Sequence, residues 1–245
     1  MKILYMNIKS FKSKRLRGII TNLVIVAVLI TVFAFSYAGG TLRVFNSEVG
    51  TQAIYQGNVE GKNVALMINV YWGDEFIQPL LDVIEDKQVK CTFFIGGVWA
   101  AVNEDLIKEI IEKNCEIGNH GYLHKSQDKL SEQESHNEIN KTHQIIKSTT
   151  GIEMKLFAPP SGAYTNKTVE IAKDLGYKTI MWTRDTIDWR DQDENLIYTR
   201  AIKNVQGGDL ILMHPTGATL KAFPRIIDYL KKNNFNVTTV SEALS

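Results

Sequence analysis

Short apolar runs alternate with amphipathic segments along residues 62–245, and this alternation constrains the fold more than any other feature of the sequence. Seven runs have the length and composition of strands: 64–70, 91–95, 116–119, 155–157, 177–182, 209–213 and 236–240. Apolar residues at helical spacing predict helices over 77–87, 105–114, 131–149, 166–175, 196–204 and 220–233. A capping-box signature from Ser131 to Glu134 opens the third of these helices. Repeated strand-then-helix order predicts a parallel α/β architecture, either a doubly wound sheet or a barrel of fewer than eight units.

The amino terminus has a different composition from the rest of the chain. Residues 1–17 carry six Lys and Arg side chains, and residues 18–38 are 21 uncharged residues, enough for a helix to span a bilayer. The positive-inside rule places the basic flank in the cytoplasm and the following residues outside. We therefore predict four parts: a cytoplasmic segment at 1–17, a transmembrane signal-anchor at 18–38, a linker or stalk at 39–61, and an exported domain at 62–245. Ser36-Tyr37-Ala38 resembles a cleavage site, so a cleaved and secreted form is the less favoured alternative.

Charge and cysteine content exclude some classes of partner and site. Lys and Arg number 28 against 27 Asp and Glu, a formal net charge of +1, which lacks the basic footprint of a nucleic-acid-binding protein. Cys91 and Cys115 show no CxxC spacing, so we interpret them as buried thiols and leave open a single bridge between them. We expect a monomer that does not bind nucleic acid.

In both candidate architectures, function is expected at the carboxyl ends of the strands. His120 and His124 follow the third run, and their spacing of four would let two imidazoles share a divalent cation, with zinc the default. His214 follows the sixth run and is either a core histidine or a catalytic acid or base. Asp185 and Asp188 could equally be helix caps or loop acids. Trp189, which follows them, is either a core residue or a stacking platform for a sugar.

Taken in order, these segments resemble the polysaccharide deacetylase family, the NodB-homology domain of carbohydrate esterase family four. The resemblance extends over residues 62–245 and rests on four ordered motifs: Ile117-Gly118-Asn119-His120 with His124, Pro160-Ser161-Gly162-Ala163-Tyr164, Asp185-Thr186-Ile187-Asp188-Trp189, and Leu212-Met213-His214. Residues 91–95 also resemble the family's second strand. The resemblance implies a distorted (β/α)7 barrel. The Trp-Gly-Asp-Glu sequence at 72–75 and the Ala-Pro-Pro-Ser-Gly sequence at 158–162 further resemble a divergent subgroup associated with endospore formers.

The resemblance also implies a function and a set of site residues. The activity would be that of a hydrolase acting on carbon–nitrogen bonds other than peptide bonds, which removes N-acetyl groups from cell-wall glycan. The cofactor would be a divalent ion, zinc first and cobalt or another ion as alternatives. His120 and His124 would bind this metal and His214 would be the catalytic acid. Asp185 and Asp188 would be further catalytic residues that support the site. The sugar would contact a third set of residues: Trp189, Tyr164, Pro160, Gly162 and Leu212.

This chain departs from the family pattern where the reaction needs carboxylates. The family's two aspartates, a general base and a metal ligand, fall on Asn69 and Val70, and its arginine falls on Ala158. An amide does not accept a proton near neutral pH, and a valine does not bind metal. Asp74 and Glu75 are candidate substitute carboxylates, although both also suit a helix start. The alternative function is therefore an impaired family member, with a degenerate metal site, that binds wall glycan or a sporulation partner without turnover.

Overall fold

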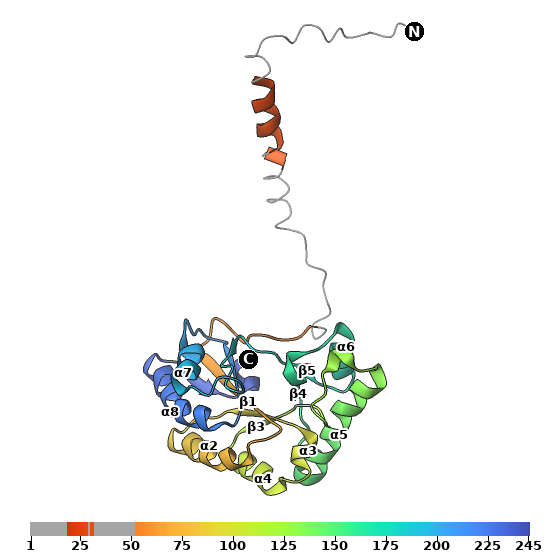
Figure 1. Cartoon of the computed structure of the whole chain (residues 1–245), viewed down its shortest axis with the longest axis vertical. Coiled ribbons are helices and arrows are strands. Elements are labelled where there is room, and N and C mark those ends of the chain that lie inside the picture. The colour runs from red at the N-terminus through yellow and green to blue at the C-terminus, as the bar shows by residue number, and fades with distance from the viewer. Residues whose placement is uncertain (1–18, 29, 32–51) are drawn as a thin grey trace. The chain divides into compact units, whose positions relative to one another are not determined.

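A computed structural model describes residues 19–28, 30–31 and 52–245 (Figure 1). Residues 19–28 and 30–31 are helical, and within the described ranges no helix is both long and apolar enough to cross a membrane. The basic segment at 1–17 and most of the second half of the expected anchor lie outside the described residues. Residues 52–245 belong to one compact unit.

The centre of this unit is a parallel sheet. Its strands are β1 (Asn63–Val70), β2 (Thr92–Ile95), β3 (Glu116–Asn119), β4 (Leu156–Phe157), β5 (Lys178–Thr179), β6 (Arg184–Asp185), β7 (Leu210–Met213) and β8 (Asn236–Thr238). The strand order is β5-β4-β3-β2-β1-β7-β6, and β8 pairs with the start of β1. Because β1 to β5 are neighbours in sequence order, the sheet has the order of a barrel and not that of a doubly wound sheet.

Helices surround the strands in Figure 1. They are α2 (Asp74–Asp86), α3 (Gly97–Ala100), α4 (Glu104–Glu112), α5 (Glu132–Thr150), α6 (Asn166–Asp174), α7 (Glu194–Ile202), α8 (Gly217–Lys232) and α9 (Val240–Ala243). Ser131 and Glu134 form the expected reciprocal capping box at the start of α5. The architecture is a parallel α/β half-barrel: β5 and β6 end the strand order, and no ladder joins them within the described part of the chain.

Side-chain alternation along β1 separates two apolar cores. Leu66, Ile68 and Val70 are fully buried in the cluster that includes α2 and α8 residues, whereas Ala65 and Met67 pack in a second cluster inside the barrel. Successive side chains of a strand point to opposite faces, so Asn69 shares the inner face with Ala65 and Met67. Burial of both faces explains why the strands are nearly continuous apolar runs.

The structure has a strand at each of the seven predicted positions and a helix at each of the six. The fifth predicted strand is shorter than expected, because only Lys178 and Thr179 of residues 177–182 pair as a strand. The chain then forms β6, which the sequence did not predict because Arg184 and Asp185 are both charged. Arg184 is accommodated by an ion pair between its Nε and Oδ2 of Asp209, at 2.6 Å. Cys91 and Cys115 are free and buried, as expected.

The compact unit begins earlier than the predicted boundary at residue 62. Ile54 forms a β-bridge with Ile180, and the amides of Gly57 and Asn58 donate to the carbonyls of Gly208 and Ala243 at 2.7 and 2.8 Å. The carboxyl end of the predicted linker at 39–61 is thus hydrogen-bonded to the domain. Polar and glycine-rich residues gave this segment the composition of a loop, but its backbone hydrogen bonds attach it to the barrel.

Candidate functional site

A cavity of about 520 Å³ lies at the carboxyl ends of the strands. Its lining comprises Asn69, Tyr71, His120, His124, Ser161, Trp182, Asp185, Trp189, Leu212 and His214. The half-barrel therefore brings together seven of the residues that the sequence analysis selected, from four separate segments of the chain.

His120 follows β3 and is held in one tautomer. Its Nδ1 lies 2.8 Å from the carbonyl oxygen of Ala158, which can only accept, so Nδ1 carries the hydrogen. Nε2 is consequently a free acceptor, and it is buried without a hydrogen-bond partner. Burial, with a smaller contribution from His124, lowers the pKa of His120 to about 3. His120 is thus a neutral imidazole with one unpaired nitrogen, the form in which histidine binds metals.

His124 lies beside His120, with 5.0 Å between the ring centroids. The Tyr71 ring stacks on His124 at a centroid distance of 3.6 Å. Burial, then the charge of His214, lowers the pKa of His124 to about 4. The predicted pairing of these two histidines is present, and Tyr71 is an additional neighbour that the sequence analysis did not select.

Asp188 and His214 form a buried dyad. The Asp188 carboxylate is fully buried, and its Oδ1 accepts a hydrogen bond from His214 Nδ1 at 2.8 Å. Its Oδ2 accepts from the His214 backbone amide and from Thr219 Oγ1, both at 2.6 Å. Three donors thus fix the carboxylate, which in turn fixes the tautomer of His214 and leaves Nε2 for a ligand. This arrangement suits a proton donor.

Asp185 contributes a carboxylate to the cavity lining. Its Oδ1 accepts from the amide of Ile187 at 2.8 Å. Burial raises the pKa of Asp185 above the usual range of aspartate, against the smaller lowering effect of that hydrogen bond. A carboxylate held in this way retains its proton more readily than an exposed one.

Asn69 and Val70, at the positions where the resemblance places two aspartates, have different surroundings. Asn69 lines the cavity, is 3% exposed, and its Oδ1 has no hydrogen-bond partner. Val70 is fully buried in the helix-side core and does not line the cavity. Ala158 is also buried, and its carbonyl oxygen accepts the hydrogen bond from His120.

The two candidate substitute carboxylates lie outside the cavity lining. Asp74 and Glu75 occupy the first turn of α2, where the helix dipole favours acidic side chains. Asp74 Oδ1 accepts from Trp99 Nε1 at 2.9 Å. The helix-start interpretation of these residues therefore agrees with the structure, which brings neither carboxylate to the histidines.

The side chains present do not complete a metal centre of the expected type. His120 and His124 supply two imidazoles, and Asn69, in the same cavity lining, adds only a neutral amide oxygen, which has no hydrogen-bond partner. Within the described residues, no group of three or more His, Cys, Asp or Glu side chains could hold an ion. Catalytic zinc sites use three protein ligands. The donor set therefore does not fit a permanently bound zinc ion.

The predicted sugar-contacting residues are divided between the cavity and its surroundings. Trp189, 55% exposed, and Leu212 line the cavity. Tyr164 does not: its hydroxyl lies 2.8 Å from that of Tyr55, and this hydrogen bond raises the pKa of Tyr164 to about 12. Pro160 is buried, and Gly162 lies against Trp182, where a Cβ would be 2.7 Å from the indole ring.

Three lining residues were missed by the sequence analysis: Tyr71, Ser161 and Trp182. Each lies within or next to a segment that the analysis inspected. Tyr71 directly follows β1, Ser161 separates Pro160 from Gly162, and Trp182 ends the fifth apolar run. Proximity to a strand end was therefore the signal that could have selected them.

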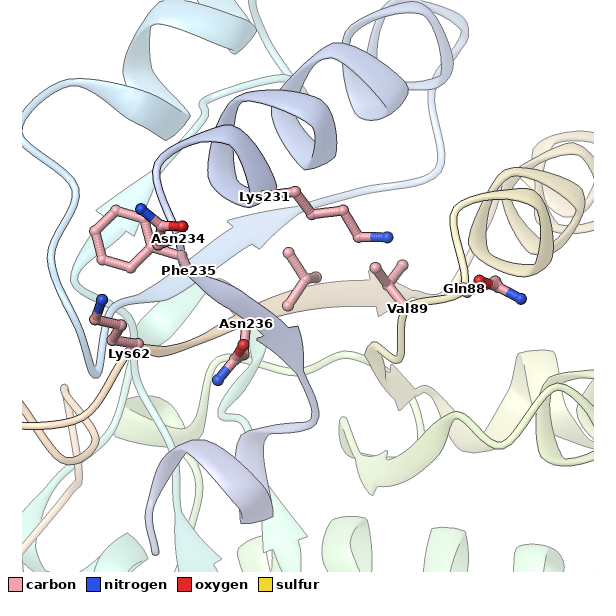
Figure 2. A pocket seen from close by; sticks show the side chains of 8 residues that line it. Lys62, Gln88, Val89, Lys231, Asn234, Phe235 and Asn236 are labelled. Carbon is pink, nitrogen blue, oxygen red and sulfur yellow. The ribbon is translucent and has the colours of Figure 1, made fainter.

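A second cavity, of about 500 Å³, opens at the opposite edge of the sheet, where β1 and β8 begin (Figure 2). Its lining is Lys62, Gln88, Val89, Lys231, Asn234, Phe235, Asn236 and Val237, which includes no carboxylate, histidine or cysteine. Lys231 lies in the last turn of α8 and donates to the carbonyl of Lys87 at the end of α2. Helix carboxyl ends attract cations, so capping of α2 accounts for the position of Lys231, and no bound ligand is needed to explain it.

Comparisons with known proteins agree with the fold and the motifs. Residues 56–180 match the family model described as Polysaccharide deacetylase. The uncharacterized protein YlxY of Bacillus subtilis is 37% identical over 193 residues, which are 79% of this chain and 60% of that protein. A peptidoglycan-N-acetylglucosamine deacetylase of Bacillus cereus is 30% identical over 175 residues, 69% of this chain and 82% of the relative.

A solved structure adds information about activity in the family. The crystal structure of a CE4 family pseudoenzyme from Bacillus anthracis superposes with a TM-score of 0.78 at 37% identity, covering 80% of this chain and 69% of that one. A mutant of the same pseudoenzyme, described as having restored enzymatic activity, matches at 35% identity with the same TM-score.

Proposed function

Because this chain belongs to the polysaccharide deacetylase family, we propose that it binds N-acetylated cell-wall glycan in the cavity at the strand ends without deacetylating it efficiently. One observation carries the proposal: the cavity keeps its histidines and exposed tryptophan, but holds the amide of Asn69 where the family has its general base. The pseudoenzyme from Bacillus anthracis, at 37% identity, supports the same interpretation.

The cavity lining has groups that can bind a sugar, although it lacks a group that hydrolysis needs. Trp189 is exposed enough to stack on a sugar face, and Leu212 and Trp182 add apolar surface. His214 and Asp185 can exchange hydrogen bonds with hydroxyl and acetamido groups. Hydrolysis needs in addition a group that takes a proton from water, and loss of such a base typically costs about 10²–10⁴-fold in rate.

A second candidate is a working deacetylase. Asp185 favours it, because this carboxylate lines the same cavity as the histidines and burial raises its pKa toward the range of a general base. In that case Asp185 would take the proton from water and the His214–Asp188 dyad would donate one to the departing amine. The incomplete metal ligand set argues against efficient turnover.

We also propose that residues 18–38 anchor the chain in a membrane and that residues 52–245 lie on the extracytoplasmic side, where wall glycan is found. The uncharged run of 21 residues and the six basic residues before it support this topology.

The test combines binding and turnover on the fragment 39–245. We expect N-acetylglucosamine oligomers and peptidoglycan fragments to bind, without acetate release, in the presence of zinc or cobalt. Trp189→Ala should weaken binding about 10-fold or more, through lost stacking. Leu196→Ala, which removes an exposed apolar side chain outside the cavity lining, is the matched control.

Turnover distinguishes the two candidates. Acetate release by the wild type that disappears in Asp185→Asn and His214→Ala would contradict the first candidate and establish the second. If the wild type is inactive, Asn69→Asp should restore release by returning a carboxylate to the cavity, because Asn69 lines the cavity and Val70 does not. Failure to bind any N-acetylated glycan would reject both candidates.

A further inference from the structure

The loop between the two site histidines is hydrogen-bonded to the rest of the domain on two sides. Residues 121–123 connect His120 at the end of β3 with His124. On one side, the amides of Gly97 and Val98 at the start of α3 donate to the carbonyls of Gly121 and Tyr122, at 2.8 and 3.0 Å. This contact ties the loop to the neighbouring strand–helix unit.

A carboxylate holds the other side of the loop. Glu138 projects from α5 and is 5% exposed, and its Oε2 accepts from the amide of Tyr122 at 3.0 Å and from that of Leu123 at 2.8 Å. The same oxygen lies 3.4 Å from the position that a Cβ on Gly121 would occupy. Burying a carboxylate is costly, and two charge-assisted hydrogen bonds offset that cost.

The loop needs such support because its backbone is unusual. Gly121 has a φ of 74° and His124 a φ of 54°, both in the left-handed region that residues other than glycine rarely adopt. Such conformations persist only when surrounding structure specifies them. The Glu138 carboxylate, the α3 amides and Asn119 Oδ1, which accepts from the Gly121 amide at 2.9 Å, hold the loop in this conformation.

From these contacts we propose that Glu138 is a positioning residue of the site: its carboxylate fixes the loop 121–123 and thereby holds the His124 imidazole beside that of His120. His120 has a separate anchor, the Ala158 carbonyl. Loss of Glu138 should therefore displace His124 and leave the His120 tautomer unchanged. The inference concerns the ligand-free protein and stands whether glycan is hydrolysed, merely bound or not bound.

Two substitutions separate the geometry of Glu138 from its charge. Glu138→Gln keeps the length and an accepting oxygen but removes the charge. Glu138→Asp keeps the charge but is shorter by about 1.5 Å, too short to reach both amides. The measurement is a long-range ¹H–¹⁵N correlation spectrum of the histidine rings, which reports tautomers and the ring-current effect of Tyr71 on His124.

We expect Glu138→Asp to shift or split the His124 ring resonances and to leave those of His120 in place. Glu138→Gln should give the wild-type spectrum. Ser135→Ala is the matched control, because it removes a buried hydrogen bond of the same helix, from Ser135 Oγ to Gln127 Oε1 at 2.7 Å, that does not touch the loop. It should lower the melting temperature without moving His124.

Unchanged His124 resonances in Glu138→Asp, or equal displacement in Glu138→Gln, would overturn the proposal. If Glu138→Asp does not fold, hydrogen exchange in the wild type decides. Protection of the Tyr122 and Leu123 amides comparable to that of Gly97 and Val98 supports the proposal that Glu138 fixes the loop. Exchange at the rate of an exposed loop amide overturns it.

Discussion

His120 and His214 differ in the group that accepts the hydrogen bond from their Nδ1 atoms. His120 Nδ1 donates to a backbone carbonyl inside the barrel, whereas His214 Nδ1 donates to the carboxylate of Asp188. In each case the second ring nitrogen is left for the cavity. Asn69 lies in the same cavity, but its amide supplies neither the base nor the anionic ligand that would join these histidines into a complete catalytic set.

The lowered pKa of His120 predicts acid sensitivity of the metal-free protein. The pKa of His120 is about 3 in the folded chain against 6.5 as its ordinary value. Between these values the unfolded chain binds a proton that the folded chain does not, so the free energy of unfolding falls as the pH falls from 6.5. The slope contributed by His120 is at most about 1.4 kcal/mol per pH unit.

Urea unfolding between pH 7 and pH 4, with a chelator present, checks this prediction against His120→Gln. The variant should lose less stability on acidification than the wild type, whatever its stability at pH 7. Carboxylates titrate at the lower end of this range in both proteins, so the difference between the two curves is the quantity to compare. Parallel curves would show that the His120 imidazole is not held neutral.

Position after a strand end, together with the family resemblance, allowed the sequence to select most of the polar residues of the cavity. His120, His124, Asp185 and His214 all line one cavity, and Asp188 contacts His214 directly. The stacking of Tyr71 on His124 could not be predicted, because it depends on the path of a loop with left-handed residues. Similarly, the hydrogen bond between Tyr55 and Tyr164 joins residues that are 109 positions apart in the chain.

At the scale of elements, the sequence predicts where a helix starts when the capping residues lie next to each other in the chain. The α5 helix begins directly after Ser131, as its capping box predicted. The β6 strand was missed because its two residues are charged, and the ion pair that accommodates Arg184 comes from Asp209, 25 residues later in the chain. A pairing of that kind leaves no periodic pattern in the sequence.

Removal of the α5 cap gives a prediction at this scale. In Ser131→Ala, the Glu134 amide loses its acceptor and the Glu134 carboxylate loses its Oγ donor. Substitutions of this kind cost about 1 kcal/mol, within a range of roughly 0.5–2 kcal/mol. Chemical denaturation should show that loss, while Ser148→Ala, an exposed serine near the other end of the helix, should stay within about 0.5 kcal/mol of wild type.

At the scale of the whole domain, its first residues are joined to its last ones. The amide of Ile54 donates to Thr179 and its carbonyl accepts from Met181, while Gly57 and Asn58 donate to Gly208 and Ala243. Gly207 packs so closely on this segment that a Cβ there would lie 1.8 Å from the carbonyl oxygen of Gly61. Backbone hydrogen bonds therefore attach residues 54–58 to the rest of the domain, although this segment does not have the composition of a strand.

Truncation tests this attachment. A fragment 62–245 loses four backbone hydrogen bonds that a fragment 52–245 keeps. At roughly 1 kcal/mol each, together with the packing of Ile54, the shorter fragment should be less stable by several kcal/mol and should melt at a clearly lower temperature. Equal melting temperatures in differential scanning calorimetry would mean that residues 52–61 do not contribute to the folded domain.

The intact cavity around Asn69 also has an evolutionary consequence. Every asparagine codon becomes an aspartate codon by a single nucleotide change, and the cavity that would receive this carboxylate already contains the two neutral imidazoles and the oriented His214. Mutation could thus return a carboxylate to this position without rebuilding the fold. A lineage carrying such a gene would keep access to a carboxylate at this position for as long as selection preserves the walls of the cavity.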